Sequence, residues 1–231
     1  KNYMKNETNL FKIEACIGTL QSGLEAEKGG ANRVELCDNL AEGGTTPSAA
    51  LIQMTKERLK IPAAVMIRPR HGDFLYSDLE FEIMKKDIEF CKTVGVEAVV
   101  FGLLTPDGQI DCQRTMRLVE SAGNMQVCFH RAVDLSRDYF EAIEQIINCG
   151  CTRILTSGGA NKAVEGFENI RKAQELYGNK IEIMVGSGIN AENVSKFHSI
   201  GIRNFHLSGK VQIDSLMTYR KEGVSMGAIS A

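Results

Sequence analysis

The sequence has almost no net charge and no long hydrophobic run. Its 231 residues include 27 basic and 29 acidic side chains, which gives a formal charge of -2. A balance this even argues against a nucleic-acid surface and against a polybasic membrane patch. No apolar run approaches the roughly 20 residues of a membrane-spanning helix, and the polar residues 1–9 lack the apolar stretch of a secretory signal. We therefore expect a cytoplasmic protein without nucleic-acid or membrane partners.

The chain also lacks paired cysteine motifs. Its seven cysteines are an odd number scattered along the sequence, with no CxxC pair, so we expect reduced thiols and no disulfide framework. Cys149 and Cys151 form the one CxC, where a predicted helix runs into a predicted strand. We expect both to be buried, because free cysteine packs as a small hydrophobe.

No low-complexity tract or Pro/Ser-rich linker divides the chain, but short β-branched runs recur at intervals of roughly 20 to 35 residues. The eight runs are residues 12–16, 33–37, 63–68, 98–102, 126–130, 152–156, 181–186 and 203–207. Helical patterns separate them, as at Phe81, Met84 and Ile88. This alternation predicts one (β/α)8 TIM-barrel domain over residues 1–231. An open doubly wound sheet is the alternative, although its GxGxxG turn is absent.

Local signals mark the helix ends. Ser77 with Glu80 reads as a capping box, and Thr46 before Pro47 predicts another helix start. Glycine stands at four predicted helix-to-strand joints, where it should adopt the left-handed conformation that ends a helix. These glycines are Gly30, Gly95, Gly150 and Gly201.

Polar side chains stand at the ends of the predicted strands, which is where barrel enzymes carry their active sites. The candidates for acid/base chemistry are Glu14, Glu35, Arg68, His130 and Asp134. We expect the first four to line one pocket at the C-terminal mouth, because strand alternation turns both glutamates to the same side. Such a cluster can hold one carboxylate ionised and another near neutrality, which suits proton transfer. A salt-bridge network that ties the strand ends together is the alternative.

Glycine-bearing turns follow the three last predicted strands. In barrels, the loops after strands seven and eight commonly bind phosphate through backbone N–H groups. The candidate anion-binding residues are Arg70, Ser157, Gly158, Gly186, Ser187, Gly188, Ser208 and Gly209. Ordinary turn chemistry is the alternative, since tight turns need residues that accept a positive φ.

Four segments resemble the CutC family closely. They read VELCDNLAEGGTTPS from Val34, MIRPRHGDFLYSDLEFEIM from Met66, CFHRAVD from Cys128 and LTSGG from Leu155, and the match is collinear from Glu14 to about Gly227. The resemblance implies a TIM barrel, a cytoplasmic copper-binding protein of copper homeostasis, and a homo-oligomer. The residues that it carries over are Glu14, Cys16, Cys37, Arg68, His130, Arg131 and Asp134.

The sequence departs from the family pattern at three places. His71 and Cys128 stand where the family usually has glycine and threonine, so neither is expected to be a metal ligand. The chain stops at Ala231, soon after Gly227, where family members continue into a last helix. We therefore expect an incomplete last helix.

Copper(I) is a soft ion that prefers sulfur, which makes Cys16 and Cys37 the candidate metal ligands. They follow neighbouring strands about 4.8 Å apart, a spacing that permits two thiolates on one ion. No CxxC or MxxM motif concentrates sulfur locally. Two functions therefore stand open, and the fold cannot choose between them. One is copper(I) binding or handling, and the other is an enzyme doing acid/base chemistry on a small anionic substrate, for example a phosphorylated one.

Overall fold

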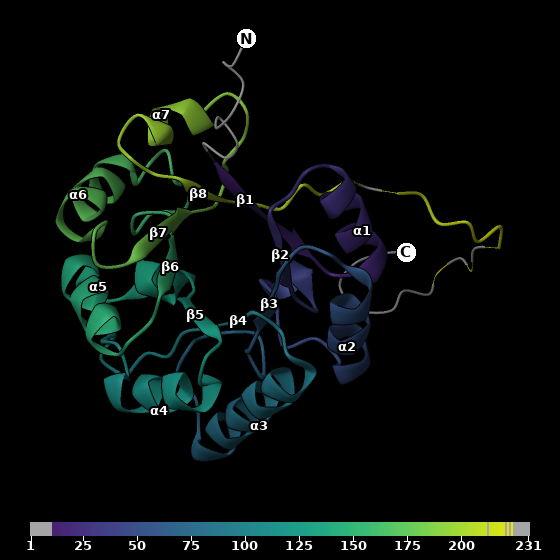
Figure 1. Ribbon diagram of the computed structural model, residues 1–231, viewed down its shortest axis with the longest axis horizontal. Coiled ribbons are helices and arrows are strands. Elements are labelled where there is room, and N and C mark those ends of the chain that lie inside the picture. Colours follow the sequence, from purple (N-terminus) through teal and green to yellow (C-terminus); the bar gives the residue numbers. More distant parts are fainter. Residues whose placement is uncertain (1–10, 212, 220, 222, 224–231) are drawn as a thin grey trace, which may run out of the picture.

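Short apolar strands, nearly all of them buried, form the centre of the molecule, and each pairs in parallel with the next along the chain (Figure 1). The computed structural model describes residues 11–211, 213–219, 221 and 223. The strands are β1 Lys12–Ile17, β2 Arg33–Leu36, β3 Ala63–Met66, β4 Ala98–Phe101, β5 Gln126–Phe129, β6 Arg153–Thr156, β7 Glu182–Val185 and β8 Asn204–Leu207. Because β8 pairs with β1, the sheet closes into the predicted barrel, and the open-sheet alternative is wrong.

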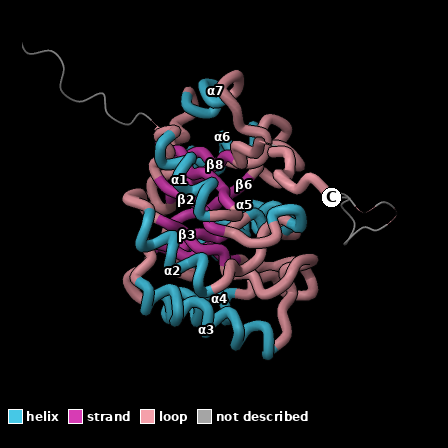
Figure 2. Tube along the Cα trace, turned by 90° about the vertical axis from the view of Figure 1, so that its right-hand side faces the viewer, coloured by secondary structure: helices cyan, strands magenta, loops and turns pink. Residues whose placement is uncertain are grey.

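Helices surround the barrel on its outer side, as Figures 1 and 2 show. In the described chain they are α1 Leu20–Lys28, α2 Ala49–Arg58, α3 Asp78–Val94, α4 Cys112–Ala122, α5 Tyr139–Asn148, α6 Phe167–Tyr177 and α7 Val194–His198, with short 3-10 helices η1 Leu40–Glu42 and η2 Arg131–Leu135. None of these helices is long and apolar enough to cross a membrane.

Alternation along the strands divides the buried side chains into two cores. Outward-facing residues such as Val34, Val99 and Phe129 pack beneath the helices. Inward-facing Val100 and Met184 belong to a smaller cluster inside the barrel. The strand register fixes which interior side chains are neighbours, and the pairs that matter for the site lie on β1, β2 and β8. Those pairs are Glu14 with Arg33, Glu14 with His206, and Cys16 with Glu35.

Most of the predicted helix ends are confirmed. The capping box of Ser77 and Glu80 starts α3, and all four joint glycines have φ between +79° and +95°. The helix start predicted at Thr46 is wrong. Ser48 caps α2 by accepting a hydrogen bond from the Leu51 amide, while the Thr46 hydroxyl accepts one from the Arg68 amide.

The segment after β8 leaves the barrel. Residues 208–211, 213–219, 221 and 223 contain no helix, and Figure 1 shows this yellow segment passing α1. The remaining residues at which a last helix is expected lie outside the described part of the chain. Cys149 and Cys151 are buried, as predicted.

Candidate functional site

A cavity of about 470 Å³ lies at the C-terminal mouth of the barrel. Among the described residues it is lined by Cys16, Glu35, Leu40, Gly43, Met66, Arg68, Phe74, His130, Arg131, Leu155, Ser187, Gly188, Ile189, His206, Leu207, Ser208 and Lys210. Three of the four residues expected to share a pocket, Glu35, Arg68 and His130, therefore do so.

Glu14 lies one layer deeper and does not line the cavity, which corrects the expectation that it would. It precedes Cys16 by two residues on β1, so its side chain points into the barrel beneath the cavity floor. Its buried carboxylate accepts hydrogen bonds from His206 Nδ1 at 2.8 Å and from Arg33 Nε. Burial raises the pKa of Glu14, but the bond and charge of His206, helped by Arg33, lower it to about 2. Glu14 is thus an ionised support for His206.

Cys16, Glu35 and His206 meet at the floor of the cavity, and Cys37 lies buried beside them without lining it. We call these four residues the sulfur cluster. The Sγ atoms of Cys16 and Cys37 are 3.9 Å apart, and Cys37 Sγ donates to Glu35 Oε2 at 3.4 Å. His206 Nε2 is 3.7 Å from the same Glu35 oxygen. One ligand atom each from Cys16, Glu35 and His206 lies within 4.8 Å of the others. Glu35 Oε1 is buried with no partner in the described chain.

The sulfur cluster favours one thiolate. A hydrogen bond from Cys37 lowers the pKa of Cys16 to about 5, with His206 contributing, against the opposing effect of burial. The same bond and burial raise the pKa of Cys37. Burial, with the negative charges of Cys16 and Glu14 nearby, raises the pKa of Glu35 to about 8. At neutral pH Cys16 is therefore a thiolate, the form that binds soft metals and acts as a nucleophile.

His206 is the residue of this cluster that the sequence analysis missed. Burial lowers its pKa, but the charge of Glu35 and hydrogen bonds to Cys16 and Glu14 raise it well above the usual range. A signal was present in the sequence. A histidine inside the apolar run at β8 shares the inward face with Asn204, and a closed barrel brings β8 beside β1.

Arg68 joins two loops. Its Nη1 donates to the carbonyl oxygens of Glu42 at 3.0 Å and Gly44 at 2.8 Å, and its Nη2 donates to that of Gly72 at 2.7 Å. The guanidinium also lies 5.0 Å from the centre of the Phe74 ring. These contacts hold the loop after β2 against the loop after β3, while the positive charge still faces the cavity.

Asp134, which lies in η2 after β5, similarly supports the loop after β6. Its buried carboxylate accepts hydrogen bonds from the Ser157 amide and hydroxyl, from the Gly159 amide and from Arg131 Nε. Both oxygens are occupied in this way, and the carboxylate does not line the cavity. The predicted acid/base set is therefore divided between the cavity, the layer below it and the loops.

His130 faces the cavity as a neutral imidazole. Burial and the charge of Arg68 lower its pKa to about 3. Nδ1 accepts a hydrogen bond from the Ala132 amide at 3.2 Å, which leaves the proton on Nε2. Nε2 is buried without a partner among the described residues. Gly102 provides the space, because a Cβ there would lie 2.6 Å from the ring.

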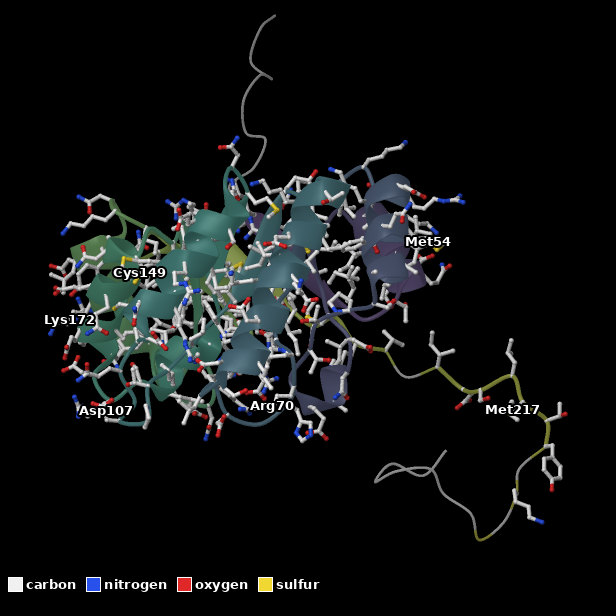
Figure 3. All side chains as sticks on the ribbon, turned by 90° about the horizontal axis from the view of Figure 1, so that it is seen from below. Met54, Arg70, Asp107, Cys149, Lys172 and Met217 are labelled. Atoms are coloured by element: carbon white, nitrogen blue, oxygen red, sulfur yellow. The ribbon has the colours of Figure 1, made fainter. Side chains whose placement is uncertain are left out.

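The predicted anion-binding residues are divided as well. Those that line the cavity are Ser187, Gly188 and Ser208, and those that do not are Arg70, Ser157, Gly158, Gly186 and Gly209. Arg70 turns outward to pair with Asp73 and Glu80, and Figure 3 shows it at an edge of the molecule. Ser157 is held by Asp134. Two cations that were not predicted as anion ligands, Arg131 and Lys210, line the cavity.

Comparisons with known proteins agree with this structure. Residues 11–211 match the sequence profile of the CutC family. A family protein CutC of Chromobacterium violaceum is 47% identical over 217 residues, which cover 94% of this chain and 88% of that one. The human protein named copper homeostasis protein cutC homolog is 43% identical over 221 residues, covering 95% of this chain and 81% of that one.

Solved structures extend the match to three dimensions. A copper homeostasis protein CutC from Streptococcus agalactiae superposes with a TM-score of 0.81 and 38% identity, covering 85% of this chain and 97% of that one. The barrel enzyme 2,3-dimethylmalate lyase has a TM-score of 0.63 at 12% identity, so it shares only the fold. The predicted resemblance is confirmed, and the chain belongs to the CutC family.

Proposed function

We propose that this protein binds copper(I) in the cytoplasm, at the sulfur cluster, with Cys16 and Cys37 as ligands. The observation that carries this proposal is the 3.9 Å separation of their Sγ atoms beside a cavity. An ion about 2.3 Å from each of two sulfurs fits that separation with a bent arrangement, which leaves room for a third ligand. Copper(I) binds such sulfur donors in preference to harder oxygen donors. The names of the related proteins point to the same metal.

His206 is the third ligand in this proposal. Its Nδ1 is held by the Glu14 carboxylate at 2.8 Å, so Nε2 is directed toward Cys16 and Glu35. Metal-binding histidines commonly have this carboxylate partner, which fixes the orientation of the ring. Copper would displace the protons of Cys37 and His206 on binding, so its affinity should rise with pH. The cytoplasm keeps thiols reduced, as this site requires.

The acid/base alternative has less support from the geometry. Nη1 and Nη2 of Arg68 donate to loop carbonyl groups, and both oxygens of Asp134 accept hydrogen bonds from the loop after β6. Glu14 is bonded to two cations beneath the cavity. These three residues are thus engaged in contacts that hold loops and strands together, whereas the hydrogen bonds of the two thiols lie within the sulfur cluster itself.

A competition titration against a chromophoric copper(I) chelator, in oxygen-free buffer with reduced protein, tests the proposal. Cys16→Ser and Cys37→Ser should each weaken copper(I) binding at least tenfold, or about 1.4 kcal/mol, because a hydroxyl is a poor ligand for a soft ion. Cys112→Ser is the matched control, since this partly exposed thiol lies at the start of α4 outside the barrel. Equal affinities of the wild type and both cluster variants would rule these thiols out.

A further inference from the structure

The cavity holds a second set of groups that copper binding does not use. Its described lining contains the cations Arg68, Arg131 and Lys210 and one carboxyl group, that of Glu35. The excess of positive charge remains whether or not Glu35 is ionised. A concave site with this balance attracts anions, because low-dielectric walls focus the field of the charges.

We propose that the side of the cavity formed by the loops after β5, β7 and β8 binds a small phosphate-bearing organic molecule. We call its contact groups the phosphate cradle: the side chains of Arg131 and Lys210, and the backbone N–H groups of Ser187 and Gly188. The inference goes beyond copper binding and does not depend on it, since no member of the cradle belongs to the sulfur cluster.

Three hydrogen bonds hold the Arg131 side chain in position and leave one of its guanidinium nitrogens, Nη1, without an acceptor among the described residues. Nε donates to Asp134 at 2.8 Å, and Nη2 donates to the Ser157 hydroxyl at 2.8 Å and the Ala160 carbonyl at 3.1 Å. No described residue accepts a hydrogen bond from Nη1. A guanidinium held in this way can offer its free donor to a phosphate oxygen with little further loss of conformational freedom.

Ser187 has a backbone conformation that few residues other than glycine adopt, with φ of +72°, and Gly188 follows with φ of +78°. The Ser187 hydroxyl donates to the Asn161 carbonyl at 2.6 Å, and its own carbonyl accepts from the Ala163 amide at 3.0 Å. Such strained residues concentrate at ligand sites, where the surrounding contacts hold them. No described residue accepts the amide hydrogens of Ser187 and Gly188.

One short segment joins these two parts of the cradle. Arg131 bonds to the carbonyl of Ala160, and Ser187 bonds to the carbonyl of the next residue, Asn161. The guanidinium and the amides of the loop after β7 are therefore held at one wall of the cavity. Loops after β7 and β8 form phosphate sites in many barrels, and Lys210 comes from the second of these loops.

His130 supplies an independent sign of a ligand. His130 is 4% exposed and is one of the residues that line the cavity, and its buried Nε2 has no acceptor among the described residues. A buried donor without a partner is unfavourable by about 1–3 kcal/mol, so an acceptor atom in the cavity stabilises it. Because Nδ1 of the neutral ring accepts the Ala132 amide at 3.2 Å, the ring proton lies on Nε2, which is therefore a donor at neutral pH.

Another part of the cavity wall is apolar and can contact the carbon atoms of an organic ligand. Leu40, Met66, Phe74, Leu155 and Ile189 give the cavity an apolar lining beside the charged groups. A volume of about 470 Å³ lies within the range of small-molecule sites. The structure therefore fits a small organic phosphate better than a bare inorganic ion.

Isothermal titration of the metal-free, reduced full chain in phosphate-free buffer tests the inference. The probes are glycerol 3-phosphate, inorganic phosphate and succinate. We expect glycerol 3-phosphate to bind most tightly. Arg131→Met and Lys210→Met should each weaken its binding at least tenfold, about 1.4 kcal/mol. Lys210 is exposed, so its variant keeps the fold even if Arg131→Met disturbs the loop.

Arg137→Met is the matched control, because Arg137 is an exposed arginine that pairs with Asp107 and does not line the cavity. This variant should bind like the wild type. Absence of binding by every probe up to about 10 mM, or binding that Lys210→Met leaves unchanged, would overturn the inference. Tighter binding of succinate would assign the cavity to carboxylates instead and overturn the phosphate class. The titration uses metal-free protein, so its outcome does not depend on copper binding and failure of the copper proposal is distinguishable.

Discussion

Burial changes the chemistry of single side chains at this site, and His130 shows it most simply. The residue stands at the end of β5, where an exposed histidine would titrate near neutral pH. Its ring instead packs against Phe74 at 4.7 Å between ring centres, and the charge of Arg68 faces it. Both the lost hydration and the neighbouring cation oppose protonation. The residue is therefore a hydrogen-bond donor and not a proton shuttle at pH 7.

This shift has a consequence for stability. The folded pKa of His130 is about 3 and the ordinary value is 6.5, so between these pH values the unfolded chain binds a proton that the folded chain does not. His130 contributes fully to the free energy of unfolding above pH 6.5. As the pH falls below that value, this contribution decreases by about 1.4 kcal/mol per pH unit. Urea unfolding at pH 7 and pH 5 measures this effect. Between these pH values, the free energy of unfolding should fall by about 2 kcal/mol less in His130→Gln than in the wild type.

His71→Gln is the control for this measurement, because the His71 side chain is 65% exposed. Its pH dependence should follow that of the wild type. An identical acid sensitivity of His130→Gln and wild type would show that His130 is protonated as easily in the folded protein as in the unfolded chain.

Residues of the sulfur cluster could be predicted where the signal lies in the local sequence, and could not where it depends on distant strands. Cys16, Glu35 and Cys37 follow from strand position alone, since alternation on two neighbouring strands turns them to one side. His206 lies 192 positions from Glu14, and only closure of the barrel makes them partners. The role of Arg68 was equally hidden, because a sequence does not show that three loop carbonyl groups will accept its donors.

At the scale of elements, repeated local signals made the strands and helices predictable. Apolar β-branched runs mark all eight strands, and glycine with a positive φ follows helix after helix. Loop geometry was harder to predict. Thr46 carries the right side chain for a helix cap, yet its hydroxyl accepts a hydrogen bond from the Arg68 amide at the end of neighbouring β3, and the cap is left to Ser48. Competition between local and distant partners decides such positions.

The loop between β6 and α6 depends on two glycines that touch. A Cβ on Gly166 would collide with the carbonyl oxygen of Ser157 and lie 2.9 Å from Gly158. Gly166→Ala should therefore lower the free energy of unfolding by about 2 kcal/mol or more, as overpacking does where backbone must move. Chemical denaturation followed by circular dichroism measures the change.

Gly29→Ala is the matched control for this loop. Gly29 ends α1 with φ of -74°, and a Cβ there meets no atom outside its own chain neighbours closer than 3.2 Å. This substitution should lower the free energy of unfolding by less than about 1 kcal/mol. Similar losses in the two variants would mean that the contact between Gly158 and Gly166 does not constrain the loop.

On the scale of the whole molecule, closure of the barrel brings charged side chains from several strands together in its interior. Arg33 bonds to Glu14 and lies 3.8 Å from Glu182, which in turn pairs with Arg153. These four buried or half-buried charges come from β1, β2, β6 and β7. Separation of any one of these strands would take a partner from at least one of the remaining charges, and an unpaired buried charge is strongly unfavourable. The network therefore favours a barrel that opens as a whole.

Heat unfolding should accordingly occur in one cooperative transition. Removing β8 or β1 from the closed sheet would expose both the outer core beneath the helices and the charged interior, so partly opened barrels are not expected to accumulate. With about 0.7 kcal/mol per residue near 60 °C, a chain of this length should absorb roughly 160 kcal/mol, and the calorimetric and van't Hoff enthalpies should agree. Far-ultraviolet circular dichroism and tyrosine fluorescence, which tryptophan does not mask because the chain has none, should give the same midpoint. Two resolved calorimetric transitions, or midpoints that differ between these probes, would show instead that part of the barrel unfolds separately.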